Sequence, residues 1–189
     1  MAKSDRRVQY TKRVMKEAVL ELLKRKSIDE VTIKEICELA DVNRGTFYLH
    51  YTQPRDILKE IENSFIEENM AIFDAYWEKQ RDLGTMSKLF TCILENRDVC
   101  RILMGENGDP QFMSSLKNLC RESILDEWQK EFPSIERGKL RFLFDFVFSG
   151  SMRLILNRID DDQGLSIEQF AQRLERLGHY SLVAAGEFL

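Results

Sequence analysis

Apolar residues recur at helical spacing along almost the whole chain, while glycine and proline are scarce, at 9 and 3 of 189 residues. This pattern predicts an all-α fold in which helices follow one another through short connections. The first four helices are expected at about residues 6–26, 32–39, 43–51 and from Pro54 onward. Further helices are expected at about 85–95, 96–105, 110–131, 135–158 and 166–185.

Residues that favour helix starts mark several of these boundaries. Thr85 and Asn96 are the expected N-caps of two consecutive helices. Asp109-Pro110 combines a cap with proline at the first helical position. Ser166 and Gln169 have the spacing of a capping box for the last helix.

Residues 32–51 have the pattern of two short helices joined by a tight turn. Thr32 can cap the first helix, and Glu35 can bond back to it as in a capping box. Asn43 follows the turn and is a good N-cap for the second helix. The pair therefore has the local chemistry of a helix–turn–helix.

The second short helix has few apolar positions. Phe47 is expected to point inward, which leaves the other faces to Arg44, Thr46, Tyr48 and His50. A short exposed helix with hydrogen-bonding and aromatic side chains suits the major groove of DNA. The alternative is an ordinary solvated helix face, and the capped helix before it favours the DNA interpretation.

The order of residues here resembles the DNA-binding domain of the TetR/AcrR family of bacterial one-component regulators. The resemblance covers about residues 8–62. Its matching features are Thr32-x-x-x-Ile36, Ala40-x-Val42 and Arg44-Gly45-Thr46-Phe47-Tyr48-x-His50-Tyr51. A weaker similarity at residues 98–112, which include Gly105-Glu-Asn-Gly-Asp-Pro-Gln-Phe, resembles ligand domains of Firmicutes-type members.

The resemblance and the residue types together assign a set of DNA contacts. Arg44 and Thr46 are the candidates for base edges, because Arg to guanine is the commonest specific contact. The backbone at Gly45 can approach DNA closely, and phosphate contacts are expected mainly from the others. The complete predicted set is Thr32, Asn43, Arg44, Gly45, Thr46, Tyr48, His50, Tyr51 and Arg55.

One position departs from the family pattern. Many members place a lysine at the start of the helix after the recognition helix, where it contacts a phosphate. Here that position is Pro54, and Arg55 follows directly. Proline suits the first turn of a helix, so the helix start is retained, and Arg55 is the candidate replacement for the phosphate contact.

Charge is distributed unevenly along the chain. Residues 1–60 hold 13 Lys/Arg and 10 Asp/Glu, whereas residues 61–189 hold 15 and 22. The first 26 residues alone carry 9 basic and 3 acidic side chains. A basic N-terminal segment on an acidic body is expected when one end meets a polyanion. Lys3, Arg6 and Arg7 either touch the DNA or form a solvated arm.

Other functional classes find little support. No stretch approaches the roughly 18 apolar residues of a membrane span, and the first residues lack the apolar core of a signal peptide, so a cytoplasmic protein is expected. The chain has only two histidines, and it has no glycine-rich phosphate loop and no residues at the spacing of metal ligands. The sequence therefore argues against an enzyme, a cofactor or a metal site. The four cysteines are expected to be reduced and buried, with a redox sensor as the alternative.

The C-terminal part of the chain has an unusually apolar segment, Phe142–Phe148. Apolar residues lie on several sides of this predicted helix, which implies that more than one side of the helix is buried. The resemblance implies a homodimer in which the last two helices of each subunit form a four-helix bundle. Aromatic and methionine side chains could line a ligand pocket, although plain core is the alternative for each. The pocket candidates are Phe73, Trp77, Phe90, Met104, Phe112, Met113, Trp128, Phe144, Asp145, Phe148 and Met152.

Asp145 is the polar member of this set. It is a candidate anchor for a cationic ligand, and the alternative is an ion pair with Arg141 or Arg153.

The resulting hypothesis has a helix–turn–helix DNA-binding domain at residues 1–60 and a helical ligand-binding and dimerisation domain at 61–189. The protein is predicted to be a homodimeric repressor that leaves a palindromic operator in double-stranded DNA when an unidentified small molecule binds. The alternatives are an activator or co-regulator that acts through a protein partner, and a helical interaction protein without DNA binding.

Overall fold

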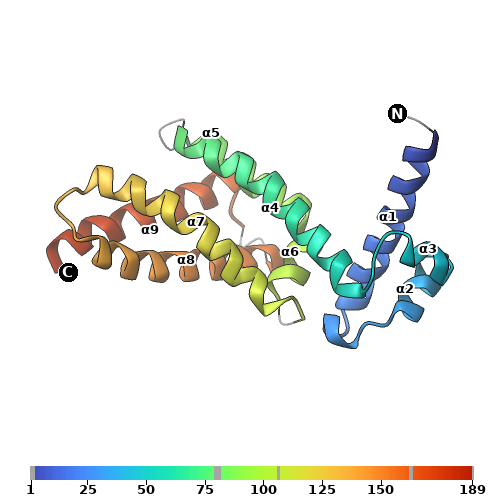
Figure 1. Ribbon diagram of the computed structural model, residues 1–189. Coiled ribbons are helices and arrows are strands. Elements are labelled where there is room, and N and C mark those ends of the chain that lie inside the picture. Colours follow the sequence, from blue (N-terminus) through green and yellow to red (C-terminus); the bar gives the residue numbers. More distant parts are fainter. Residues whose placement is uncertain (1–2, 79–81, 106, 162–163, 189) are drawn as a thin grey trace. The chain divides into compact units, whose positions relative to one another are not determined.

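The computed structural model describes residues 3–78, 82–105, 107–161 and 164–188, and within these ranges it contains helices and no strand. The prediction of an all-α fold is therefore confirmed. The N-terminal elements are α1 (Lys3–Leu23), the 3-10 helix η1 (Ile28–Glu30), α2 (Ile33–Leu39), α3 (Arg44–Tyr48) and α4 (Pro54–Glu78). They are followed by α5 (Leu83–Glu95), α6 (Arg97–Met104), α7 (Pro110–Glu131), α8 (Arg137–Asp160) and α9 (Ile167–Phe188) (Figure 1).

Most helix starts follow the local chemistry of the sequence. In α9, the Ser166 N–H donates to Gln169 Oε1 and the Gln169 N–H donates back to Ser166 Oγ, which confirms the predicted capping box. At α5 the prediction of Thr85 as the cap is wrong. The cap is Asp82, whose carboxylate accepts from both the N–H and the hydroxyl of Thr85 at 2.7 Å. An ionised carboxylate accepts more strongly than a hydroxyl.

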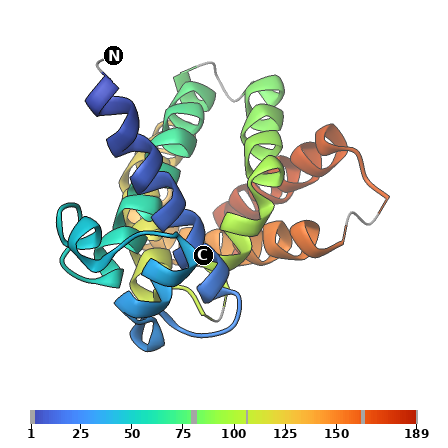
Figure 2. The same ribbon diagram turned by 90° about the vertical axis from the view of Figure 1, so that its right-hand side faces the viewer.

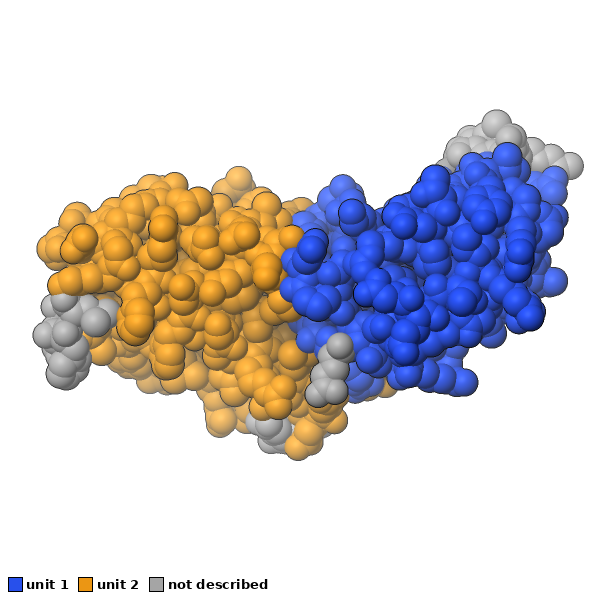
Figure 3. All heavy atoms as spheres, turned by 60° about the horizontal axis from the view of Figure 1, so that its bottom comes forward, with its two compact units in different colours: residues 1–67, 98–112 blue, residues 68–97, 113–189 orange. Residues whose placement is uncertain are grey.

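The chain divides into two compact units (Figure 3). Unit 1 contains residues 1–67 and 98–112, and unit 2 contains residues 68–97 and 113–189. The helix α6 and the loop after it thus belong with the N-terminal helices.

The core of unit 1 forms where the first four helices converge. Met15 and Val19 of α1, Ile36 of α2, Phe47 of α3 and Leu58 of α4 are all fully buried. The helices α2 and α3 are too short to be stable alone, so burial of their apolar side chains in the core shared with α1 and α4 stabilises them.

The loop between α6 and α7 folds tightly against the end of α6. A Cβ at Gly105 would lie 2.3 Å from the carbonyl oxygen of Arg101, and one at Gly108 would lie 2.4 Å from that of Leu103. Only glycine fits this close backbone approach. The loop delivers Phe112 to Phe65 of α4, with ring centroids 6.0 Å apart.

Unit 2 has its own core of packed helices. Here α9 packs against both α5 and α8 (Figures 1 and 2). Phe90 of α5 meets Phe170 of α9 edge-on at 5.2 Å. Trp128 of α7 packs on Phe144 of α8, which in turn contacts Phe148. None of the described helices is long and apolar enough to cross a membrane.

Candidate nucleic-acid interface

Each of the two helices α2 and α3 starts at a side-chain cap. At α2 the Glu35 N–H donates to Thr32 Oγ1 at 3.3 Å, while the Thr32 N–H donates to Glu35 Oε2 at 3.0 Å. This confirms the predicted capping box. Hydrogen bonds from Lys26 and then Thr32 lower the pKa of Glu35 to about 2. The first helix of the pair therefore starts at a fixed point.

The turn itself is set by Asp41, which has a left-handed φ of 51°. Aspartate tolerates this conformation better than most side chains. The Val42 N–H bonds back to the Cys37 carbonyl at 3.0 Å, as in a Schellman-type helix end. The reversal fixes the direction in which α3 leaves α2.

Asn43 caps α3 through its amide oxygen. Asn43 Oδ1 accepts from the Thr46 N–H at 2.7 Å and from the Thr46 hydroxyl at 3.1 Å, which confirms the predicted cap. A Cβ at Gly45 would lie 3.2 Å from the same oxygen. Gly45 thus leaves room for the cap as well as for the approach of another molecule to the backbone.

The outer surface of α3 carries two exposed side chains, Arg44 and Tyr48. Arg44 is exposed, and no carboxylate of the described chain lies within ion-pair distance of its guanidinium. Tyr48 is 60% exposed while the edge of its ring packs against Phe47 at 5.5 Å. Thr46 and His50 are half-buried. Four of the predicted contacts, Arg44, Gly45, Thr46 and Tyr48, thus belong to α3, and Arg44 and Tyr48 have its exposed side chains.

Leu49, which the sequence prediction omitted, is 80% exposed and is the most exposed large apolar side chain of the described residues. Exposure of one leucine is ordinary by itself. Its position between Tyr48 and His50 places it on the surface that the polar candidates share. Its neighbours in sequence were the only signal that pointed to it.

Tyr51 lies inside the unit rather than on this surface. Its side chain is 5% exposed, and its hydroxyl donates to Glu60 Oε2 at 3.0 Å. Burial and this carboxylate both raise the pKa of Tyr51. The phosphate contact predicted for Tyr51 does not fit its placement, because its polar atom is already bonded within the protein.

Arg55 also has partners within unit 1. Nη2 bonds to Asp29 Oδ1 at 2.6 Å, and Nη1 bonds to Asp109 Oδ2 at 2.7 Å. These two ion pairs compete with the phosphate contact predicted for Arg55. They also join three segments that are far apart in sequence: η1, the start of α4 and the α6–α7 loop.

The basic N-terminal segment is partly neutralised in the fold. Lys12 and Lys16 both bond to Glu60 at 3.0 Å, and four other cations of this segment pair with glutamates of α1 and α2. Arg6 and Arg7 are exposed. The excess positive charge that the sequence places in residues 1–26 is thus concentrated at the beginning of α1.

The predicted pocket residues are divided between the two units. Met104 and Phe112 belong to unit 1, whereas Phe90, Met113, Trp128, Phe144, Phe148 and Met152 belong to unit 2. Within unit 2, Phe90 packs on Phe170, and the Trp128 cluster packs on itself. Phe73 and Met152 are half-buried, and the side chain of Trp77 lies outside what the structure describes.

Asp145 has a different partner from the two arginines suggested by the sequence. Its Oδ1 lies 2.8 Å from Lys117 Nζ of α7. The expected pairing with Arg141 or Arg153 is corrected, because the neighbouring helix supplies a closer cation.

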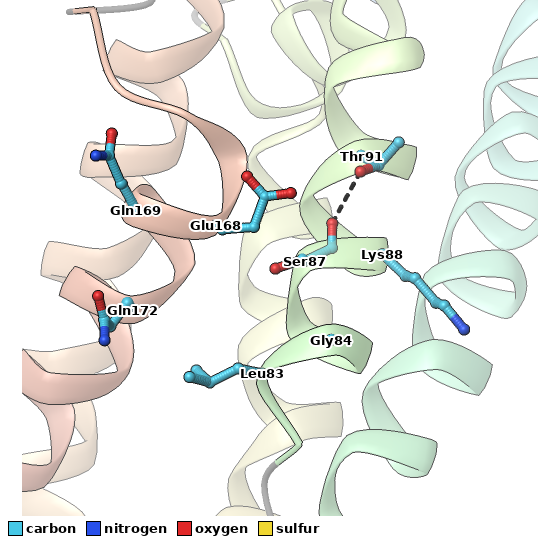
Figure 4. Close-up of a pocket in the computed structure, with 8 residues that line it drawn as sticks. All are labelled: Leu83, Gly84, Ser87, Lys88, Thr91, Glu168, Gln169 and Gln172. Carbon is cyan, nitrogen blue, oxygen red and sulfur yellow. Dashed lines mark hydrogen bonds between the residues drawn. The ribbon is translucent and has the colours of Figure 1, made fainter.

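Unit 2 has a surface groove of about 520 Å³ between α5 and α9 (Figure 4). It is lined by Leu83, Gly84, Ser87, Lys88, Thr91, Glu168, Gln169 and Gln172. None of these is a predicted pocket residue, and most are polar, whereas small-molecule sites are mostly apolar.

The helices α8 and α9 expose an apolar face in unit 2. Phe142 and Phe146 are each 68% exposed, although an isolated subunit would bury such side chains. Gly150 follows one turn after Phe146, and a Cβ there would meet nothing within 4 Å. The remaining exposed apolar members are Leu154, Leu177, Tyr180 and Val183. We refer to this set as the α8–α9 face.

The four cysteines, all among the described residues, are not joined in disulfides. Cys37, Cys100 and Cys120 are buried and Cys92 is half-buried. Burial raises the pKa of Cys120 to about 11 and also raises the pKa of Cys37. A thiol held in its protonated form reacts slowly. Across the described residues, no cluster of three His, Cys, Asp or Glu side chains is arranged to hold a metal ion.

Two family models match the chain. Residues 17–61 match "Bacterial regulatory proteins, tetR family", and residues 83–180 match "Transcriptional regulator C-terminal region". The uncharacterized HTH-type transcriptional regulator YxbF of Bacillus subtilis (strain 168) is 27% identical over 174 residues, which cover 86% of this chain. The chain spans only 43% of the length of that relative.

The fold also matches a solved structure. The crystal structure of TetR transcriptional regulator from Streptococcus agalactiae 2603V superposes with a TM-score of 0.63 at 22% sequence identity. The match covers 96% of this chain and 97% of that chain.

Proposed function

We propose, on the basis that this chain belongs to the tetR family of bacterial regulatory proteins, that it is a homodimeric repressor of transcription. In this proposal it binds a palindromic operator through residues 1–60 and leaves the operator when a small molecule binds to residues 61–189. The observation that carries the proposal is the double-capped α2–turn–α3 unit, which presents Arg44, Tyr48 and Leu49 outward.

The exposed surface of α3 supports DNA contact through its chemistry. Arg44 has no competing carboxylate among the described residues, so its guanidinium is available for bidentate bonding to a guanine edge. Leu49 suits an apolar contact with the methyl group of a thymine. Tyr48, His50 and Thr32 are the proposed phosphate contacts, and Thr46 and Asn43 hold α3 in place through the cap.

Dimerisation is supported by the α8–α9 face. Its large exposed side chains lie on two adjacent helices, and Gly150 would let a partner helix approach closely. In a closed two-fold assembly the same face of each subunit meets its copy. Two recognition helices related in this way read a palindrome whose half-sites are spaced by whole turns of DNA.

The effector is proposed to bind within unit 2. The aromatic cluster of Trp128, Phe144 and Phe148 offers an apolar wall, and Asp145 with Lys117 offers a polar edge. Because α4 runs from residue 54 to residue 78, it belongs to both units. It is the proposed connection through which the effector acts on the helix–turn–helix. The effector can shift the protein from its DNA-binding to its DNA-released conformation only by as much as its affinity differs between these two conformations.

Selection of duplexes from a random library by the purified protein tests this proposal. The expected result is an enriched inverted repeat, which indicates both DNA binding and a two-fold assembly. Enrichment of a single half-site would contradict the dimer, and no enrichment above the unselected library would contradict DNA recognition.

A further inference from the structure

A group of four charged side chains in unit 1 combines two buried carboxylates, Glu62 and Asp109, with a half-exposed arginine and an exposed aspartate. It consists of Asp29, Arg55, Glu62 and Asp109, which we refer to as the Arg55 cluster. Arg55 occupies its centre, since its two terminal nitrogens bond to carboxylates from two different segments. Asp109 is only 6% exposed, whereas the Arg55 side chain is about a third exposed, so salt screens this pair less than it would screen a fully exposed pair.

Asp109 is fixed by the loop that carries it. Its Oδ1 accepts from the Gln111 N–H at 2.9 Å, while its Oδ2 accepts from Arg55. Gly105 and Gly108 allow the loop to fold back on α6. Two features that the sequence singles out, Arg55 after Pro54 and the Gly105–Phe112 segment, therefore meet in one ion pair.

Glu62 is the member that has no visible partner. It lies two turns after Arg55 on α4 and is 9% exposed, and its Oε1 is buried without a hydrogen bond. Burial first, and then the nearby Asp109 carboxylate, raise the pKa of Glu62 to about 7. The charged groups that act on it are Asp109 from the loop packed against α4, and Arg55 and Lys59 of α4 itself.

The two protonation states of Glu62 act differently on the cluster. A neutral Glu62 leaves Asp109 as the buried partner of Arg55. An ionised Glu62 places a second buried negative charge near Asp109, which repels that carboxylate and competes for the same guanidinium. Ionisation of Glu62 therefore weakens the bond between the α6–α7 loop and the start of α4.

We propose that Arg55 is a positioning residue that joins the helix–turn–helix to the α6–α7 loop, and that Glu62 makes this junction respond to protonation. The inference rests on the proposed DNA binding only for its effect on affinity. Arg55 contacts η1, which directly precedes α2, as well as the loop. When the junction loosens, α2 and α3 are free to move. Binding to DNA must then order them again, and this loss of entropy reduces the affinity for DNA.

Unfolding at different pH values tests the proton response without DNA. Wild type, Glu62→Gln and the control Glu67→Gln, an exposed position on α4, are unfolded in urea between pH 5 and pH 8.5. Glutamine keeps the shape of Glu62 without its charge. The stability of wild type relative to Glu62→Gln should fall as the pH rises from 5 to about 7 and should level off above that, and Glu67→Gln should follow wild type. Parallel profiles for wild type and Glu62→Gln would overturn the role of Glu62.

DNA binding tests the positioning role of Arg55. The probe is a duplex selected by the wild-type protein, titrated over a range of salt concentrations with Arg55→Ala, Asp109→Asn and the double variant. If Arg55 acts through Asp109, each single variant loses about fivefold in affinity. The double variant then loses no more than Arg55→Ala, and the slope of log K against log salt is unchanged.

A phosphate contact by Arg55 would give a different result. Arg55→Ala would then reduce the salt slope by about 0.9 for each lost phosphate contact, Asp109→Asn would not weaken binding, and Arg55→Lys would retain affinity. Under the positioning role, Arg55→Lys loses affinity, because a lysine point charge does not reproduce the two-sided fork of arginine.

The pH dependence of binding completes the test. Affinity of wild type should fall about fivefold relative to Glu62→Gln between pH 6 and pH 8. Both proteins should be compared in a His50→Gln background, so that the histidine next to the proposed DNA surface contributes equally to both profiles. Equal pH profiles would overturn the inference. If the wild-type protein binds no DNA, the proposed function fails, and the urea experiment still decides the role of Glu62.

Discussion

The hydroxyl of Tyr51 donates a hydrogen bond to Glu60 at 3.0 Å, and the same carboxylate binds Lys12 and Lys16 of α1. Tyr51 thus links the segment after the recognition helix to both α1 and α4. Lys12 also lies 5.4 Å from the centre of the Tyr51 ring. Tyr51 therefore helps to hold the helix–turn–helix against α1 and α4.

Tyr51→Phe should reduce stability without reducing the number of DNA contacts. The substitution removes one buried hydrogen bond and keeps the ring, so the expected loss is about 1 kcal/mol. Urea unfolding measures it, and a salt titration of DNA binding provides the second readout. A shallower salt slope in Tyr51→Phe would show instead that its hydroxyl contacts a phosphate.

Glu60 should make the protein sensitive to acid. Burial alone would raise the pKa of Glu60, but hydrogen bonds from Lys12, Lys16 and Tyr51 lower it to about 2. Because the folded-state pKa lies below the unfolded value, the stabilisation is present above about pH 4.5 and is lost as the pH falls toward 2. Wild type should therefore exceed Glu60→Gln in urea stability at pH 6, and this difference should shrink at pH 3. A difference that does not depend on pH would contradict the ion-pair account.

Arg44→Ala should weaken binding to selected duplexes more than binding to random ones. A bidentate contact to a base is worth about 1–3 kcal/mol of discrimination, so the specific complex should lose about tenfold or more. Arg25→Ala, which removes a strongly exposed arginine paired with Glu21, is the matched control and should have little effect. Equal losses on selected and random DNA would assign Arg44 to phosphate rather than to a base.

Leu49 should couple to one thymine in each half-site. Replacing that thymine by uracil removes only the methyl group, which is worth about 0.8 kcal/mol or roughly fourfold in affinity if it is buried against leucine. Thymines of a selected duplex are replaced one at a time, and wild type is compared with Leu49→Ala by anisotropy. The sensitive thymine should lose its effect in Leu49→Ala. The assignment is wrong if no thymine shows this coupling.

If the α8–α9 face forms the proposed dimer, Phe146→Glu should convert it to a monomer. The substitution places a charge in the middle of the α8–α9 face, where it would be buried without a partner in the assembly. Sedimentation equilibrium measures the mass, and circular dichroism shows whether the helices persist. The control is Leu119→Glu on α7, where the leucine is 47% exposed outside this face, and it should remain dimeric. A folded dimer in Phe146→Glu would place the interface elsewhere.

Features that depend on neighbouring residues could be predicted from the sequence. The Thr32 capping box and the Asn43 cap use partners three residues away, so residue type and spacing were sufficient. The helix start at Pro54 follows for the same reason. Thr85 shows the limit even here, because a stronger acceptor, Asp82, lies three residues before it.

Features that depend on distant residues could not be predicted in this way. Arg55 finds Asp109 across 54 residues, and Lys12 finds Glu60 across 48. Neither partner follows from local spacing. Aromatic residues such as Phe90 and Phe144 suit a core as well as a pocket. Residue type alone therefore could not indicate that each of them packs in a different aromatic cluster.

DNA binding by the wild-type protein is the most direct test of the account. A fluorescently labelled fragment from upstream of its own gene is titrated with the protein between 50 and 300 mM salt. The account predicts specific binding whose affinity falls steeply as salt rises, because phosphate contacts release counterions. No binding at the lowest salt, to this or any other upstream fragment, would contradict a regulator that acts through α3.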